Sequence, residues 1–394
     1  MKKAFIVIGL GYGDEGKGLS TDYLCRTIKN PIVIRFNGGH QAGHTVVTGN
    51  GQRHVFSNFG AGTFRGCPTY WSRYCTFSPS YLLFEVKELG LIPKLYVDAY
   101  CPVTTHYDIL FNRAIESTRG IQRLGSCGMG FGATVDRHFK DFVRLYVSDL
   151  LKPVIYMQKL KAIRSYYMQK MERETKFRFA DFNHDAEDIV FNEYVEKIHT
   201  FFSKNDFVLT SEDKLFSNPT WDNYIFEGAQ GVLLDQEFGF KPFITKSNTT
   251  SKNAIKILSD NLKSSSLDIN VYYVTRCYLT RHGYGPFMQM GDEYKLKNTE
   301  LETNIFNEFQ GEFKVGYLNI DLLNYAIKCD QKFSSGANTN IIVTCLDQLP
   351  TENIKYFLKG KLNEESPNKL ASHIECKVND TLYSYHPCSD NLIF

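Results

Sequence analysis

Residues 4–19, AFIVIGLGYGDEGKGL, decide the fold of this 394-residue chain. The segment opens with five apolar residues and then meets glycine, which is the pattern of a short buried strand. Apolar residues return at helical spacing from about Lys17 to Arg26, and a second apolar run at residues 31–36 stops at Asn37. This order of strand, glycine-rich turn, helix and strand is typical of an α/β fold.

Three later apolar runs, at residues 223–226, 269–274 and 341–344, each precede a polar or glycine-rich segment. Because ligands of open α/β sheets bind beyond the carboxyl ends of the strands, these segments are candidate binding loops. No linker or repeat divides the sequence. We therefore expect one large α/β domain over residues 1–394, with a central, mostly parallel sheet flanked by helices, a core like that of P-loop NTPases, and a helical subregion at about 150–220.

The composition excludes several classes of protein. A balance of 45 Lys and Arg against 43 Asp and Glu argues against a strongly basic nucleic-acid binder. No window approaches the ~20 apolar residues of a membrane span, and glycine interrupts the short apolar start that would otherwise resemble a signal peptide. The 10 cysteines form no C-x-x-C pair, which favours reduced thiols. We expect a cytoplasmic protein that binds neither nucleic acid nor membranes.

The glycine-rich segment 11–18 is the first candidate site. Its glycines let backbone N–H groups approach an anion, the following helix offers its positive end, and Lys17 can neutralise phosphate oxygens. The spacing differs from ordinary nucleotide-binding loops, because Gly18 rather than a hydroxyl residue follows the lysine. Asp14 would repel a phosphate unless a cation intervenes or the carboxylate transfers protons. The pattern also fits a simple glycine turn with solvated acidic residues.

The second candidate is the loop NGGHQAGHT at residues 37–45. It carries His40 and His44 directly after a predicted strand, and histidine suits proton transfer and the stabilisation of developing charge. A metal site is the rival interpretation, but no cysteine or carboxylate joins the two histidines locally.

Two further regions are weaker candidates. Residues 125–132, GSCGMGFG, can form an anion cradle or a flexible connector. Residues 226–231, FEGAQG, place Gln230 at a strand end, where its amide can hydrogen-bond a base or a phosphate. The hydroxyl-rich segment 245–250 can also bind phosphate oxygens, although many loops have this composition.

Together and in this order, the segments resemble the adenylosuccinate synthetase family. The matching blocks are GDEGKG at 13–18, GGHQAGHT at 38–45, EGAQG at 227–231, TKSNTT at 245–250 and TRHGYGP at 280–286. They are spread over about residues 4–350, which is most of the chain. The family joins aspartate to inosine monophosphate (IMP) with the γ-phosphate of GTP and Mg²⁺, so the resemblance implies a C–N bond-forming ligase of purine biosynthesis.

The resemblance also implies roles for individual residues. Asp14 matches the general base that takes the purine ring proton and also binds Mg²⁺. His44 matches the residue that supports charge moving between the 6-oxygen and the phosphoryl group, and Lys17 joins them as a catalytic residue. The donor triphosphate is expected at Gly13, Glu15, Gly16, Lys17, Gly18, Gly43, Thr45 and Asp347, with Mg²⁺ at Asp14 and Gly43.

The remaining substrates are assigned in the same way. The acceptor nucleotide is expected at Asp14, Gln41, Ser126, Cys127, Arg144, Gln230 and Thr245. Family members are homodimers in which a basic residue of one subunit reaches the acceptor phosphate in the other. Arg144 or Lys140 is the candidate for that residue here. For the amino acid, L-aspartate in the family, Arg281 and Lys314 are this chain's own candidate cations, because the family's arginine-rich loop is missing here.

The sequence departs from the family pattern in three places. Cys345 stands where a lysine is usual in the donor-base motif, which leaves both GTP and ATP as donors. Gln41 and Cys127 replace an asparagine and a threonine at the acceptor site. The segment 307–317, NEFQGEFKVGY, replaces an arginine-rich loop that binds aspartate, and only Lys314 is cationic in it. A carboxylate prefers a forked arginine partner, so the amino acid is bound differently or is not aspartate.

Three alternatives remain at this point. Some viral relatives make the 2-amino analogue from dGMP and often carry a smaller residue at the position of Asp14, so the retained Asp14 favours IMP. A non-catalytic nucleotide-binding paralogue is the second alternative, and Asp14, Lys17 and His44 argue against it. A P-loop hydrolase is the third, and it would need no acceptor nucleotide.

Overall fold

A computed structural model describes residues 2–263, 267–291, 294–302, 306 and 308–394. In these ranges ten strands form one sheet, in the order β16-β15-β12-β9-β1-β8-β2-β5-β6-β7. Their bounds are β1 Lys2–Gly9, β2 Pro31–Arg35, β5 Thr69–Trp71, β6 Leu95–Asp98, β7 Phe207–Thr210, β8 Asn223–Gly231, β9 Leu267–Arg276, β12 Asn338–Thr344, β15 Asp380–Ser384 and β16 Leu392–Ile393. Only β15 and β16 pair antiparallel, so the predicted central and mostly parallel sheet is confirmed.

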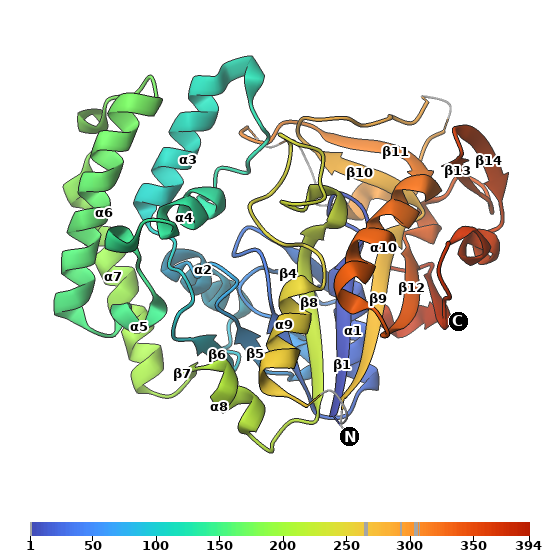
Figure 1. The fold of residues 1–394 in the computed structure, drawn as a ribbon, viewed down its shortest axis with the longest axis horizontal. Coiled ribbons are helices and arrows are strands. Elements are labelled where there is room, and N and C mark those ends of the chain that lie inside the picture. The colour runs from blue at the N-terminus through green and yellow to red at the C-terminus, as the bar shows by residue number, and fades with distance from the viewer. Residues whose placement is uncertain (1, 264–266, 292–293, 303–305, 307) are drawn as a thin grey trace.

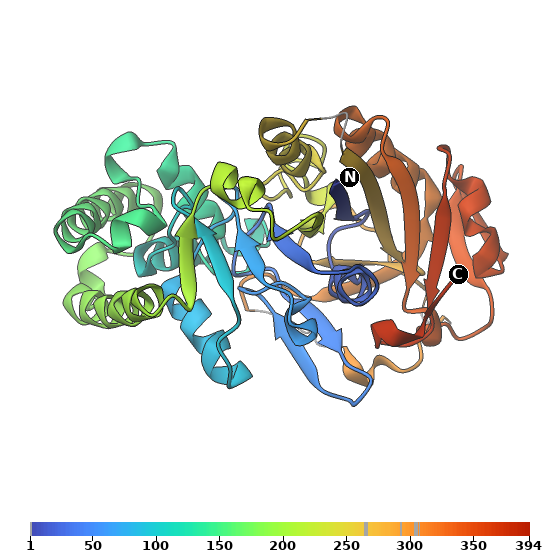
Figure 2. The same cartoon turned by 90° about the horizontal axis from the view of Figure 1, so that it is seen from below.

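Helices flank both faces of this sheet (Figure 1). They are α1 Lys17–Thr27, α2 Pro79–Leu89, α3 His106–Arg119, α4 Phe131–His138, α5 Val147–Leu150, α6 Pro153–Glu174, α7 His184–Ser203, α8 Glu212–Ser217, α9 Lys252–Asn261 and α10 Ile320–Ser334. Figure 2 shows α9 and α10 on one side of the sheet and α1 on the other. The predicted α/β class with helices around the sheet is therefore also confirmed.

Strand β1 lies inside the sheet and is buried on both faces. Its even-numbered side chains, such as Ile6, belong to the apolar cluster that includes α9 and α10. Its odd-numbered side chains, such as Val7, pack with Leu19 and Leu24 of α1. Because successive strand residues point to opposite faces, a continuous apolar run is what a strand covered on both sides requires.

A smaller sheet and a ribbon lie beside the carboxyl end of the large sheet. The small sheet has the order β10-β11-β13-β14, with bounds Tyr278–His282, Phe313–Asn319, Ile354–Leu358 and Lys361–Glu365. The ribbon pairs β3, His44–Val47, with β4, Arg53–Phe56. The small sheet contributes His282 and the ribbon contributes His44.

The helical part of the molecule begins and ends at other residues than the predicted range of about 150–220. The described helices α3 and α4 gather with α6 and α7 beyond the β6–β7 edge of the sheet (Figure 1), so this part begins near His106. Within the predicted range, Phe207–Thr210 form β7, which pairs with β6 as an edge strand. This short aromatic and β-branched run is suited to a strand, and its partner lies more than 100 residues earlier, so local sequence could not reveal the pairing.

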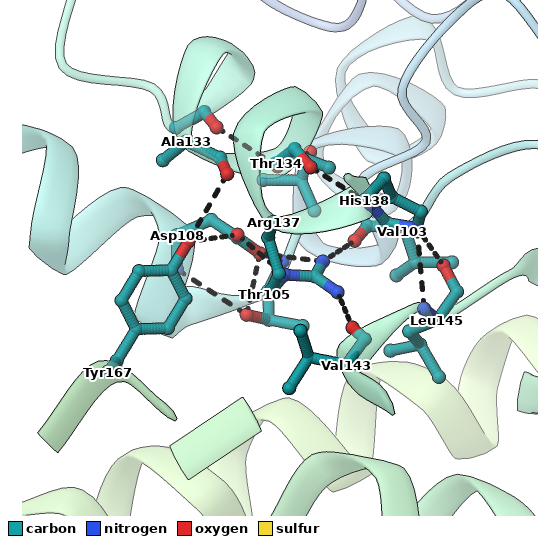
Figure 3. A network of polar contacts seen from close by, with 12 residues as sticks. Val103, Thr105, Asp108, Ala133, Thr134, Arg137, His138, Val143, Leu145 and Tyr167 are labelled. Atoms are coloured by element: carbon teal, nitrogen blue, oxygen red, sulfur yellow. Dashed lines mark hydrogen bonds and ion pairs between the residues drawn. The ribbon is translucent and has the colours of Figure 1, made fainter. Parts of the chain in front are cut away.

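A buried ion pair holds α3, α4 and α6 together (Figure 3). The guanidinium of Arg137 donates to both carboxylate oxygens of Asp108, at 2.9 and 3.1 Å, and to the carbonyl oxygens of Val103 and Val143. The Tyr167 hydroxyl donates to the same carboxylate at 2.7 Å. Burial raises the pKa of Asp108, but the charge and hydrogen bonds of Arg137 outweigh burial, so that pKa lies below its ordinary value. The network fixes α4, which follows the glycine loop at 125–130.

We expect Arg137→Met to lower the free energy of unfolding by about 3–5 kcal/mol, because it leaves the carboxylate of Asp108 buried without its cation. Urea unfolding followed by circular dichroism measures this change. Arg178→Met is the matched control, because Arg178 forms an ion pair with Asp181 on the surface and its side chain is 77% exposed. Equal unfolding midpoints for the two variants would contradict the structural importance of the buried pair.

Candidate functional site

The loops that follow β1, β2, β8, β9, β12 and β15 meet at one edge of the sheet, because these strands run parallel. They surround a cavity of about 870 Å³, which is within the range of small-molecule sites. The position matches the expectation that ligands of open α/β sheets bind beyond the strand carboxyl ends.

Most of the residues singled out in the sequence line this cavity. They are Gly13, Asp14, Gly16, Lys17, Gly18, Gln41, Gly43, His44, Thr45, Ser126, Cys127, Gln230, Thr245, Arg281 and Asp347. The structure does not bring Glu15, Arg144 or Lys314 to its wall. His40 also lies outside the wall, where its Nε2 contacts the Met129 carbonyl oxygen at 3.1 Å and burial lowers the pKa of its ring to about 4.

The glycine loop between β1 and α1 is built for an anion. Helix α1 begins at Lys17 after Gly16, whose φ of 99° is left-handed, and no side chain caps the first N–H groups. A Cβ on Gly18 would lie 2.6 Å from the carbonyl oxygen of Thr45, so a glycine here lets α1 approach the His44 loop closely. Uncapped N–H groups and the helix dipole favour a phosphate at this point.

Glu15 has a place that the sequence did not suggest. Its carboxylate turns inward, is 3% exposed, and accepts the N–H groups of Gly11 and Gly13 at 3.0 and 2.8 Å. It also accepts the ammonium of Lys17 at 2.5 Å. Glu15 therefore shapes the loop and orients Lys17 from behind, rather than facing the cavity as a predicted donor-binding residue should.

Asp14 faces the cavity from a strained backbone position with φ of 65°. Its Oδ2 lies 3.2 Å from Nε2 of His282, and its carbonyl oxygen accepts the Nε–H of Arg276. Burial raises the pKa of Asp14, but the hydrogen bond and charge of His282, with the charges of Arg276 and Lys17, outweigh it. The pKa lies below its ordinary value, so Asp14 is a carboxylate at neutral pH.

His44 lines the same cavity and is held by a residue that the sequence analysis quoted but gave no role. Its Nδ1 lies 2.6 Å from Oε1 of Glu227, in the middle of β8, and Glu227 also accepts the N–H of Ala61. Both side chains are buried. An ionised carboxylate on Nδ1 directs Nε2 of His44 away from Glu227, which is the arrangement that orients catalytic imidazoles.

A fully buried arginine stands behind this pair. Arg35 ends β2 directly beside Glu227 in the parallel register, and its guanidinium lies 5.1 Å from the centre of the Trp71 ring. Among the described residues, none accepts a hydrogen bond from its side-chain nitrogens. Burial lowers the pKa of His44, and the charge of Arg35 lowers it further despite the opposing effect of Glu227. The imidazole is therefore neutral at pH 7.

Apart from Arg144, the residues predicted for the acceptor nucleotide line the cavity from separate segments of the chain. Both amide atoms of Gln41 and Oε1 of Gln230 are buried and have no hydrogen-bond partner within the described ranges. Ser126 donates to Asn112 at 2.9 Å, and burial raises the pKa of the Cys127 thiol, which is therefore protonated. Buried amides without partners are rare in proteins, so these groups are positioned to bind a ligand.

The two residues predicted for the amino acid are placed differently. The guanidinium of Arg281 is almost fully buried and already donates to three backbone carbonyl oxygens, of Tyr284, Pro286 and Phe243. Lys314 is its neighbour across the β10–β11 pair and does not line the cavity. Asn307, the first residue of the segment that replaces the arginine-rich loop, lies outside the described residues. The guanidinium of Arg281 is thus already bonded to the backbone, and the ammonium of Lys314 lies off the cavity wall.

The far end of the cavity is lined by the loops after β12 and β15. Cys345 has a left-handed φ of 62°, and Asp347 follows it in a short turn. The carbonyl oxygen of Asp347 accepts a hydrogen bond from the side-chain amide of Asn298. Burial raises the pKa of Asp347 above its ordinary value. His386, from the loop after β15, lines the same end and was not a candidate in the sequence analysis.

No group of three or more His, Cys, Asp or Glu side chains gathers as a metal site in the described part of the chain. Magnesium does not need such a group, because it usually takes one or two protein oxygens and completes its shell with phosphates and water. Asp14 and Gly43, both on the cavity wall, offer a carboxylate and a backbone carbonyl of this kind. The residues therefore fit Mg²⁺. None of the described helices is long and apolar enough to cross a membrane.

The parallel sheet, the anion loop and the large cavity at the strand carboxyl ends are those of a nucleotide-binding enzyme. Residues 6–385 match the family model of adenylosuccinate synthetase, and the chain belongs to that family. A relative from Pasteurella multocida, named adenylosuccinate synthetase, is 32% identical over 315 residues, which are 76% of this chain and 69% of the relative. One of the same name from Mesoplasma florum is 30% identical over 95% of this chain and 85% of its own length.

Solved structures share the fold. Fully ligated adenylosuccinate synthetase from Plasmodium falciparum superposes with a TM-score of 0.78 at 18% identity, covering 99% of both chains. Cyanophage S-2L succinoaminodeoxyadenylate synthetase, bound to dGMP and to dATP as energy donor, superposes with a TM-score of 0.65 at 16% identity, covering 100% of this chain and 95% of that one. The expected family, its ligase class and its place in purine biosynthesis are therefore confirmed.

Proposed function

We propose that this ligase phosphorylates the 6-oxygen of IMP with a nucleoside triphosphate and then lets L-aspartate displace the phosphate, giving adenylosuccinate. The observation that carries the proposal is the arrangement of Asp14, Lys17 and His44 around one cavity. A carboxylate, an anion loop with its lysine and an oriented imidazole are the groups that an acid–base-assisted phosphoryl transfer needs.

Asp14 acts as the general base of the first step. The purine 6-oxygen becomes a nucleophile when the proton on the neighbouring ring nitrogen N1 is removed, and the lowered pKa of Asp14 keeps its carboxylate ready to accept that proton. The hydrogen bond from His282 holds the carboxylate in one orientation. The 6-oxygen then bonds to the γ-phosphorus, and the bond from that phosphorus to the β,γ-bridging oxygen breaks.

His44 and Lys17 stabilise the charge that moves during this transfer. Lys17 neutralises the γ-phosphate from the start of α1. A bound triphosphate adds negative charge beside His44, which raises the pKa of the imidazole and favours its protonated form. Nε2–H of His44 then donates to the oxygen between the purine and the phosphoryl group, while Glu227 balances the ring charge at 2.6 Å from Nδ1.

The proposal includes Mg²⁺ at Asp14 and Gly43. When bound, Mg²⁺ neutralises charge on the β- and γ-phosphates. The phosphates of the donor lie at the backbone of Gly13, Gly16, Gly18 and Thr45, and its base lies at Asp347. Glu15 supports this site through Lys17.

The acceptor monophosphate is bound by Gln41, Ser126, Cys127, Gln230 and Thr245. Arg144 lies outside the cavity of its own subunit, and its side chain bonds to the His138 carbonyl oxygen and to Asp141. In our proposal a homodimer brings Arg144 to the acceptor phosphate of the partner subunit. The predicted cytoplasmic location stays a prediction.

The amino acid is proposed to bind beside Arg281. Arg281 borders the cavity, and its backbone partners lie in the segments 284–286 and 243 that surround the same space. Lys314 lies on β11, outside the wall of the cavity. Aspartate therefore remains the proposed co-substrate on the basis of family membership.

A matrix of purine monophosphates, triphosphate donors and amino acids, scored for phosphate release in Mg²⁺, tests the proposed function. We expect release with IMP, aspartate and GTP or ATP, together with a new ultraviolet-absorbing product. Release only with dGMP and ATP would instead indicate a 2-aminoadenylosuccinate synthetase. Binding of nucleotides without release under any pairing would indicate a non-catalytic paralogue, and release without an acceptor would indicate a hydrolase.

A further inference from the structure

Two cysteine side chains meet beside α1, outside the wall of the central cavity. Cys25 lies in the second half of α1 and is buried, whereas Cys67 lies in the turn before β5 and is half-buried. Cys25 belongs to the apolar cluster between α1 and the sheet, and Cys67 packs against the same cluster. Their thiols share a hydrogen bond, so the two sulfur atoms are close neighbours in the folded chain.

A tight turn brings Cys67 back to α1. A short 3₁₀ turn at Thr63–Arg65 is followed by Gly66, whose φ of 76° is left-handed. The backbone N–H of Cys67 then donates to the carbonyl oxygen of Gly62 at 3.1 Å. A Cβ on Gly62 would lie 2.3 Å from Sγ of Cys25 and 3.1 Å from the Cβ atoms of both cysteines. Glycine at this position therefore leaves the gap in which the two thiols meet.

An ion pair fixes this turn on α1. Both carboxylate oxygens of Asp22 accept hydrogen bonds from the guanidinium of Arg65, at 2.9 and 2.8 Å. Asp22 and Cys25 are three residues apart on α1, so they lie on one face of the helix. Arg65 and Cys67 belong to the same turn. The ion pair thus holds the two thiols next to each other.

The two thiols differ in reactivity. The hydrogen bond from Cys25 and the charge of Arg65 lower the pKa of the Cys67 thiol, and they outweigh the opposing effects of burial and of Asp22. Burial raises the pKa of the Cys25 thiol well above its ordinary value. Because the thiolate is the nucleophile in disulfide exchange, Cys67 is the thiol that attacks. Cys25 is the protected thiol that resolves a mixed disulfide on its neighbour.

We propose that Cys25 and Cys67 form a reversible thiol–disulfide pair, which low-molecular-weight disulfides oxidise at Cys67 and which then ties α1 to the turn before β5. The inference goes beyond the ligase reaction and does not depend on it.

The oxidation proceeds in two exchange steps. The thiolate of Cys67 attacks one sulfur of the small disulfide and expels one thiolate, which leaves a mixed disulfide on the chain. Sγ of Cys25 then bonds to Sγ of Cys67 and expels the second thiolate, which takes the proton of the Cys25 thiol. Two cysteines are thereby oxidised to one disulfide, while the small disulfide is reduced to two thiols.

The new bond closes a covalent ring around residues 25–67, which include the loop at 37–45 and the β3–β4 ribbon. Cross-linking a long segment restricts the unfolded chain and so stabilises the folded one. We expect the unfolding temperature to rise by about 5 °C on oxidation and to fall back when dithiothreitol reduces the bond.

Incubation of the folded chain with oxidised glutathione, followed by alkylation and peptide mapping by mass spectrometry, tests the inference. We expect a disulfide between Cys25 and Cys67 as the main product. Cys25→Ser should stop the reaction at a glutathione adduct on Cys67. Cys67→Ser should prevent the disulfide and leave the thiol of Cys25 unmodified.

Cys376→Ser is the matched control, because Cys376 is also half-buried but burial raises the pKa of its thiol. In this variant the disulfide should form at the wild-type rate. In the wild-type chain Cys67 should react at least about 10-fold faster than Cys376. The inference is overturned by a glutathione adduct that persists on Cys67 in the wild-type chain, by equal rates at Cys67 and Cys376, or by no reaction of the pair. An unfolding temperature that oxidation leaves unchanged also overturns it.

Discussion

The Asp14→Asn variant should bind both nucleotides yet release phosphate about 10³-fold more slowly than the wild-type ligase. An amide occupies the same space as the carboxylate and can keep a contact with His282, so the cavity should survive the change. What the amide cannot do is accept the N1 proton of the purine. Without that proton transfer the 6-oxygen stays a weak nucleophile, so the loss falls on the chemical step.

Single-turnover phosphate release, compared with calorimetric binding of the acceptor, separates the two effects. Asp260→Asn is the matched control, because Asp260 lies on α9 in a surface pair with Lys256 and the same charge is removed far from the cavity. Near-normal phosphate release by Asp14→Asn would remove Asp14 from the role of general base. A loss of binding as large as the loss of rate would point instead to a structural role for its charge.

The pH dependence of the wild-type rate follows from the same carboxylate. The pKa of Asp14 is lowered, because the contributions of His282, Arg276 and Lys17 outweigh burial. A base with a lowered pKa is ionised at neutral pH and loses activity only as the pH falls through that lowered value. We therefore expect no loss of single-turnover rate from Asp14 between about pH 8 and pH 5. A pH profile in which Asp14→Asn removes a limb near pH 6 would contradict this.

The fold was predictable where it depends on local pattern. The apolar run of β1, the glycine loop and the start of α1 at Lys17 are all visible in residues 4–19, because a strand buried on both faces must be continuously apolar. The pairing of Phe207–Thr210 with β6 was not predictable, because it depends on a partner more than 100 residues away. The small sheet around β10 is equally non-local.

The site divides in the same way. Asp14, Lys17 and His44 are unusual residues in glycine-rich loops, so they stand out in the sequence. Glu227, Arg35, His282 and His386 are ordinary residues until the sheet brings them beside Asp14, His44 and Asp347. For Glu15 the sequence was misleading, because its position in the loop suggested a contact with the ligand. In the structure Asp14 has a left-handed backbone, and the Glu15 side chain after it faces inward.

His44→Ala should slow phosphate release by about 10²-fold, because the oxygen between the purine and the phosphoryl group then loses its hydrogen-bond donor during the transfer. The measurement is single-turnover phosphate release at saturating IMP and donor. Binding of the donor should change much less than the rate. A rate within a few fold of wild type would show that Lys17 and the backbone alone stabilise the charge that develops during the transfer.

Glu227→Gln tests whether the imidazole acts with its buried partner. The glutamine keeps a side chain of the same size 2.6 Å from Nδ1 but removes the charge that balances a protonated ring. We expect Glu227→Gln alone to slow phosphate release by about 10-fold or more, as with other partners that orient a histidine. Added to His44→Ala, it should slow phosphate release little further. Groups that act as a unit are non-additive, because the second change has nothing left to remove. If the losses of rate are fully additive in the double variant, His44 acts without Glu227. The role of Glu227 is then to support the fold around Ala61, whose backbone N–H it accepts.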